Sequence, residues 1–181
     1  TTFKYSRRNI MANTTFSGPV RSLNGFINFG PKAAVSLTAD TTLTMNDHAG
    51  RTLLCNDADG KFLLPTITTG SAGSTAGAND PNVASNLGAT YTFIVQTVAS
   101  DMDIYTDGTD KFIGFARSLM TTAATGVDWF PGAANDVMTF NGTTTGGIVG
   151  TIVRVTAVAS AQYFVEAYIK SSGTQATPFA D

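Results

Sequence analysis

Apolar and polar residues alternate most regularly between positions 90 and 114. Tyr91, Phe93, Val95 and Thr97 alternate with Thr92, Ile94, Gln96 and Val98. A period of two in β-branched and aromatic residues is typical of a strand with one buried face. The pattern resumes at 102–106, and Asp107-Gly108 offers residue types that suit a tight turn before 111–114. The stretch therefore predicts three consecutive strands, a β-meander that serves as scaffold.

Short strand patterns also flank this stretch. They lie at 35–38, 42–45, 51–55, 61–64, 137–140, 151–158 and 163–170. Pro65 suits a strand end because it cannot donate to a ladder, and Asn141-Gly142 is a strong hairpin signal. The last two strands predict a further hairpin. The predicted fold is all-β, a single β-sandwich or β-barrel of about nine short antiparallel strands.

Two long interruptions separate these strands. Residues 68–89 are small, polar and nearly uncharged, with a weak helical turn at 81–86, and we expect them at a surface or rim. Residues 115–135 predict a second long loop. Trp129 and Phe130 are expected to hold that loop against the body or a neighbouring subunit, which makes them a possible interface.

Residues 1–32 show no sustained period and predict an extended N-terminal arm ahead of a body at 33–181. The arm has a net charge of +5 and no carboxylate, whereas the remainder carries −7. Its candidate partner-binding residues are the aromatic and basic ones, namely Phe3, Tyr5, Arg7, Arg8, Phe16, Arg21, Phe26, Phe29 and Lys32. We expect docking on an acidic protein surface, with a solvated terminus next and nucleic acid last, because the charges are too dilute.

Composition supports one all-β domain. The 181 residues suffice for a sizeable core, and 43% are hydrophobic. Charged residues make up only 13%, and Thr, which favours strands and turns, occupies 29 positions. No apolar run is long enough to span a bilayer and no signal peptide is recognised, so we expect a soluble protein with no membrane partner.

Catalytic and metal-binding residues are scarce. His48 is the only histidine and Cys55 the only cysteine. No Gly-x-Ser-x-Gly elbow is present, and a zinc site lacks ligands. We expect His48 in a turn and Cys55 buried on a strand, with no cofactor and no catalytic site.

Carboxylates offer a weaker candidate for chemistry. Asp57 and Asp59, and the group at 101–110, resemble calcium loops, but neither stretch has the full twelve-residue pattern with a terminal Glu. Asp beside Gly is ordinary turn chemistry, which we favour. A carboxylate pair for glycoside hydrolysis stays open without any feature that indicates a groove. The glycine-rich stretch at 70–77 lacks the Lys of a phosphate loop.

Several segments carry a resemblance that spans most of the chain past Met11. They are 11–22 with Asn24-Gly25-Phe26, 62–65, 88–93, 107–114, 135–142 and 176–179. In this order they resemble small β-rich virion structural proteins of tailed bacteriophages of the marine and cyanophage type, most closely a capsid decoration (cement) protein. Residues 1–10 depart from that pattern.

The resemblance implies a non-enzymatic virion component on the outer surface of the capsid, assembled in the bacterial host cytoplasm. The expected partners are the major capsid protein and further copies of the chain, with a homotrimer favoured, and no nucleic acid. The alternative is a receptor- or glycan-binding tip domain of a tail or head fibre. That alternative would use the loops at 68–89 and 115–135, with Tyr105 or Trp129 as stacking residues.

Overall fold

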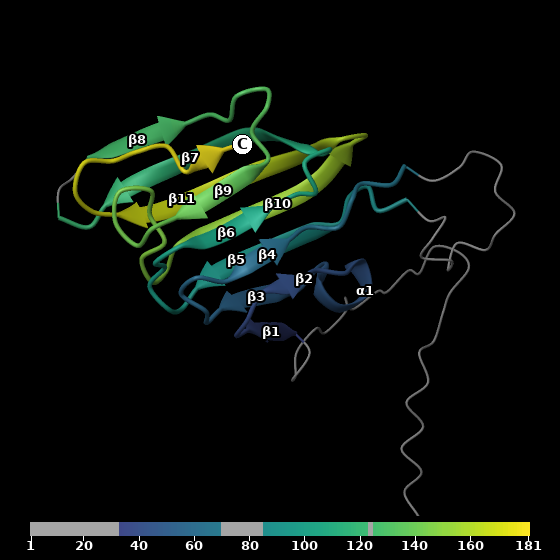
Figure 1. The fold of residues 1–181 in the computed structure, drawn as a ribbon, viewed down its shortest axis with the longest axis horizontal. Helices are drawn as coiled ribbons and strands as arrows, with labels where there is room; N and C mark the ends of the chain where they lie inside the picture. Colours follow the sequence, from purple (N-terminus) through teal and green to yellow (C-terminus); the bar gives the residue numbers. More distant parts are fainter. Residues whose placement is uncertain (1–32, 70–84, 123–124) are drawn as a thin grey trace, which may run out of the picture.

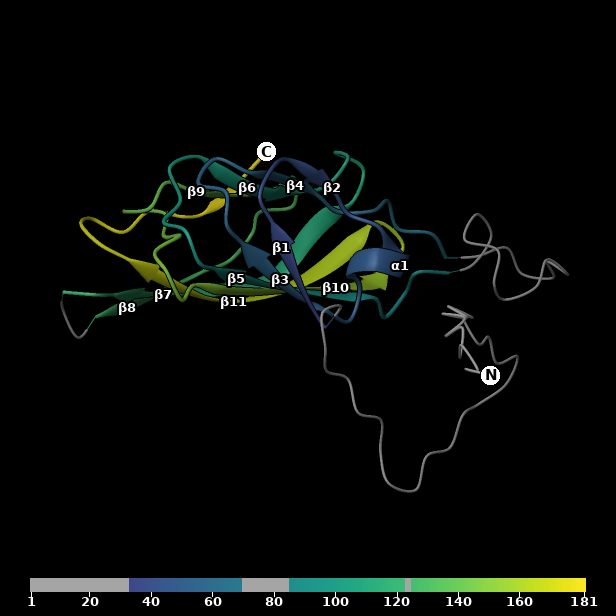
Figure 2. The same cartoon turned by 90° about the horizontal axis from the view of Figure 1, so that it is seen from below.

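A computed structural model describes residues 33–69, 85–122 and 125–181. These form two mixed β-sheets that face each other, with one short helix at the side (Figures 1 and 2). The seven-stranded sheet runs in the order β1 (Ala34–Leu37), β3 (Thr52–Cys55), β5 (Thr90–Val95), β10 (Ile152–Ala159), β11 (Gln162–Ser171), β7 (Lys111–Met120) and β8 (Gly126–Trp129). The five-stranded sheet runs in the order β12 (Phe179–Ala180), β9 (Val137–Phe140), β6 (Met102–Tyr105), β4 (Lys61–Leu63) and β2 (Thr41–Thr42).

The all-β prediction is confirmed, but the strand count and the purely antiparallel pairing are wrong. The described residues hold twelve strands instead of about nine. Strand β3 pairs in parallel with both β1 and β5, and β4 pairs in parallel with β2 and β6. The reason is the route of the chain. Strands β1 to β6 alternate between the two sheets, so that β3 and β5 return to one sheet, and β4 and β6 to the other, in the direction of the strand before.

The predicted meander at 90–114 is wrong for the same reason. Strands β5 and β7 belong to the seven-stranded sheet, but β6 between them belongs to the five-stranded one. Asp107-Gly108 therefore lies on a connection between sheets instead of in a hairpin. The alternation correctly located three strands with one buried face each, but it holds no information on which strands pair.

Asn141-Gly142 also does not close a hairpin. Strand β9 pairs with β6 and β12, and the next strand, β10, lies in the other sheet. The Asn141 side chain instead organises a local loop, because its Oδ1 accepts the backbone N–H of Thr143 at 2.9 Å and of Thr145 at 3.1 Å. The predicted final hairpin is confirmed as β10 and β11, which pair antiparallel from Ile152 opposite Tyr168 onward.

The long loop predicted at 115–135 is largely strand. Strand β7 continues to Met120, and β8 pairs antiparallel with it. Gly114 obscures the pattern because it stands at an inward position without a side chain. Strand β2 in turn ends at Thr42, earlier than predicted, because Thr44 caps the helix α1 (Met45–His48) by accepting the N–H of Asp47.

The hydrophobic core lies between the two sheets. Tyr91 and Phe93 enter it from the seven-stranded sheet, and Phe62, Ile104 and Phe140 enter from the five-stranded sheet, all with 0% of their surface exposed. The rings of Phe62 and Phe93 stack across the interface with centroids 6.1 Å apart. Because both sheets bury one face in the same core, the opposite face of each sheet is free to carry function.

Candidate functional site

The far side of the seven-stranded sheet is the first candidate surface. Every second residue of β5, β10 and β11 enters the core, so the residues between them point away from it. We name this surface the outer face; its apolar members include Leu54, Ile94, Ile152, Tyr168, Phe164 and Ile113. In the described part of the chain nothing covers it (Figure 2).

The apolar residues of the outer face are aligned across strands. Leu54 stands opposite Ile94, Ile94 opposite Ile152, and Ile152 opposite Tyr168. Ile152 is 39% exposed and Tyr168 45% exposed. A sheet face that meets water usually carries polar side chains, so a continuous row of apolar ones indicates a surface that binds something.

Two ion pairs lie on this sheet face. Arg154 stands opposite Glu166, with Nη1 and Oε2 3.4 Å apart. Arg117 donates two hydrogen bonds to Asp128, at 2.7 and 2.8 Å, and these lower the pKa of that carboxyl. These four charges cancel, whereas Lys170 on the same side of β11 donates through Nζ to the Val149 carbonyl at 2.8 Å. Ile152, Arg154, Glu166 and Tyr168 surround a shallow hollow of about 170 Å³ near its centre.

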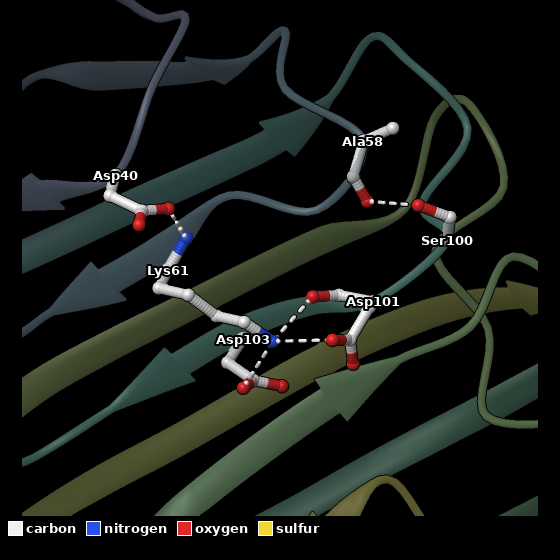
Figure 3. A network of polar contacts seen from close by, with 6 residues as sticks. All are labelled: Asp40, Ala58, Lys61, Ser100, Asp101 and Asp103. Atoms are coloured by element: carbon white, nitrogen blue, oxygen red, sulfur yellow. Dashed lines mark hydrogen bonds and ion pairs between the residues drawn. The ribbon is translucent and has the colours of Figure 1, made fainter.

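A second candidate is a carboxylate hollow of about 520 Å³, whose lining residues are Asp40, Asp57, Asp59, Asp101, Lys61, Thr38 and Ala39. Lys61 organises part of it (Figure 3). Its Nζ lies 2.7 Å from Asp103 Oδ2 and 3.1 Å from Asp101 Oδ2, and its backbone N–H donates to Asp40 Oδ1. These contacts tie β4 to the start of β6 and to the segment before β2.

The electrostatics of the hollow fit structural pairing. Partial burial lowers the pKa of Lys61, but hydrogen bonds to Asp103 and Asp101 outweigh it and the net shift is upward. Desolvation and the neighbouring Asp59 raise the pKa of Asp57. Nowhere in the described residues do three or more His, Cys, Asp or Glu side chains come together as a metal site. The lysine bridges two of these carboxylates, and nothing here indicates a bound cation.

The remaining aspartates of the 101–110 group hold a turn. Asp107 accepts the Thr109 N–H through Oδ1 and the Thr66 hydroxyl through Oδ2. Asp110 is buried, and its Oδ2 accepts the Ile67 N–H at 2.7 Å. They fasten the connection between β6 and β7 to the segment that follows β4.

The single cysteine and the single histidine do not form a catalytic pair. Cys55 is fully buried in β3, and burial raises the pKa of its thiol to about 12. His48 ends α1, and its Nδ1 accepts the Thr44 N–H at 2.9 Å. A thiol that stays protonated inside the core cannot serve as a nucleophile.

The residues predicted as binding sites fall in two groups. The arm candidates, from Phe3 to Lys32, lie outside the described residues. The two residues predicted as an interface, Trp129 and Phe130, lie in different environments. Trp129 packs against the core with its Nε1 buried, whereas Phe130 is 71% exposed. Trp129 therefore holds β8 to the body, and only Phe130 is open to a partner.

The outer face was missed by sequence reasoning, although a signal was present. The residues Ile94, Ile152, Phe164 and Tyr168 fall at positions where an ordinary solvated strand would carry polar side chains. Strands β5, β10 and β11 are thus apolar on both faces in part of their length. Such runs indicate a sheet that is covered on both sides.

Comparison with known proteins gives no match: no protein-family model, curated sequence or solved structure is similar to this chain. Across the described residues, none of the helical structure is long and apolar enough to cross a membrane. Fold and surfaces together define a protein of two mixed β-sheets with an apolar, charge-paired outer face.

Proposed function

We propose that this chain is a structural virion protein, a capsid decoration (cement) protein of a tailed bacteriophage, with a β-sandwich body. The observation that carries the proposal is the outer face. A row of apolar side chains from Leu54 to Tyr168, with neighbouring charges already paired, suits a permanent protein contact better than a reaction site. The resemblance of the sequence to phage virion proteins supports the specific role.

In this role the arm at 1–32 binds the major capsid protein, and the body sits on the outside of the shell. The +5 charge of the arm and its lack of carboxylates favour an acidic capsid surface. A protein that binds only the assembled shell stabilises it by mass action, in proportion to the logarithm of its concentration over the dissociation constant.

The test is binding of the purified protein to phage heads that lack it, measured by co-sedimentation. The variant F16S/F26S/F29S is expected to lose at least tenfold in affinity, since each substitution removes apolar area from the contact. Val98→Ser is the matched control, because Val98 is 49% exposed on the body outside the arm. Undiminished binding of the triple variant would exclude docking through the arm. A copy number of hundreds per virion is expected.

The second candidate function is a receptor- or glycan-binding tip domain of a phage fibre. The observation that favours it is Tyr168, whose exposed ring lies beside the Arg154–Glu166 pair in the central hollow. An aromatic face next to charged hydrogen-bonding groups can stack on a sugar. Saturable binding to a glycan array that is lost in Tyr168→Ala would support this role. Absence of binding to any glycan on the array would count against it.

A further inference from the structure

We infer that the outer face binds the same face of a second copy of this chain, back to back, about a twofold axis that runs along the strands between β10 and β11. This inference rests on the proposed function, because the outer face is the surface on which that proposal is based and the inference names its partner. A contact of this kind makes a dimer, in contrast to the trimer that the resemblance favours.

The size of the face suits such a contact. Four strands about 4.8 Å apart and about eight residues long at about 3.3 Å each give about 500 Å² in flat projection. Because side chains project from the sheet, the solvent-accessible area of the face is larger than this flat area and approaches the roughly 800 Å² that each partner buries in a stable interface. The exposed apolar members include Phe164 and Ile113, which are each 37% exposed and stand opposite each other on β11 and β7.

The register makes the face complementary to itself. Ile152 stands opposite Tyr168, Arg154 opposite Glu166 and Thr156 opposite Phe164. A twofold axis parallel to the strands and midway between β10 and β11 places each of these residues over its cross-strand partner in the second copy. Arg154 then faces Glu166 of the other copy, and Ile152 faces Tyr168 beside the central hollow. Opposite charges are thus set face to face at the Arg154–Glu166 pair, as a twofold contact requires.

Charge disfavours the other available occupant, the arm. The arm carries +5, whereas the carboxylates Glu166 and Asp128 of this sheet face are already paired with Arg154 and Arg117, and Lys170 adds a further positive charge to the face. Carboxylates such as Asp40, Asp57 and Asp59 gather instead at the carboxylate hollow, which the chain's own Lys61 lines. The outer face therefore offers the arm no electrostatic attraction, but it offers a second copy both signs of charge in matching positions.

The test is a charge exchange in the full-length protein, measured by sedimentation equilibrium. The wild type is expected at twice the mass of the chain at micromolar concentration. R154E and E166R, each alone, are expected to raise the dimer dissociation constant at least tenfold, because like charges then face each other. An equimolar mixture of the two variants is expected to restore the dimer, as is the double variant R154E/E166R.

The matched control is R51E, since Arg51 donates to the Asn46 carbonyl beside α1 and lies outside the outer face. It is expected to remain dimeric. A monomeric wild type, a trimer insensitive to R154E, or a mixture that stays monomeric would each overturn the inference. Deletion of 1–32 that converts a monomer into a dimer would identify the arm as the occupant instead. Binding of these variants to phage heads is measured separately by co-sedimentation. A protein that forms the dimer but does not bind phage heads would contradict only the proposed function.

Discussion

Two tyrosines of the core, Tyr163 and Tyr91, differ in whether their buried hydroxyl has a hydrogen-bond partner. The Tyr163 hydroxyl donates to the Pro65 carbonyl, which joins β11 to the end of β4 across the core. The Tyr91 hydroxyl is also buried but has no hydrogen-bond partner in the described structure. A buried polar group without a partner costs desolvation free energy that folding does not recover.

Tyr91→Phe is therefore expected to leave the free energy of unfolding unchanged or to raise it by up to about 1 kcal/mol. Tyr163→Phe is the matched control and is expected to lower it by about 1 to 2 kcal/mol, because the Pro65 carbonyl loses its donor. Urea denaturation followed by fluorescence measures both. Equal destabilisation by the two substitutions would show that the Tyr91 hydroxyl does have a partner.

At the scale of single elements, Gly114 decides how β7 fits the sheet. It stands opposite Val165 on β11 with a φ of +113°, a conformation that side chains rarely allow. A Cβ atom at this position would come within 2.1 Å of the Val165 carbonyl oxygen. The strand can therefore pair with β11 along its whole length only if this residue is glycine.

Gly114→Ala is expected to lower the free energy of unfolding by more than about 3 kcal/mol, from backbone strain and the clash together. Gly88→Ala is the matched control: its φ is +84°, but a Cβ there meets nothing within 4 Å. It is expected to cost only about 1 to 2 kcal/mol from strain. Equal losses in thermal denaturation would mean that β7 shifts to absorb the methyl group.

The sequence could locate most of these elements because alternation is a local property. Strands β3, β6, β9, β10 and β11 fall where period-two patterns predicted them. Strand β8 was missed because Gly126 and Asp128 interrupt the apolar pattern, and of its two inward residues at the sheet edge, Val127 and Trp129, Val127 is 39% exposed. Strand β12 was missed because it has only two residues, Phe179 and Ala180, held by pairing with β9.

On the scale of the whole molecule, ionisable groups buried between the two sheets predict a loss of stability at alkaline pH. Burial raises the pKa of Cys55 from 9.0 to about 12 and that of Tyr91 from 10.0 to about 12, and it raises the pKa of Tyr163 as well. At pH values between the unfolded and the folded pKa of a group, the unfolded chain has released a proton that the folded chain still holds. The free energy of unfolding therefore has its full value below pH 9 and falls as the pH rises toward 12.

The free energy of unfolding is expected to decline from about pH 9, by at most about 1.4 kcal/mol per pH unit for each group that titrates. Cys55→Ala is expected to be less stable at neutral pH, but with a flatter profile between pH 9 and 10. Tyr91→Phe is its control, since it alters the slope only above pH 10. Urea midpoints across pH 7 to 11 measure this, and a wild-type profile that stays level would contradict it.

Local alternation and composition were enough to predict the all-β class, the positions of the main strands and the contrast between a basic arm and an acidic body. The folded structure was needed to show that successive strands alternate between sheets, that several pair in parallel, and that Leu54, Ile94, Ile152 and Tyr168 form one row. These residues come from four strands, of which only β10 and β11 are neighbours in sequence. Pairing between distant strands depends on how whole strands share one core, and no local pattern encodes it.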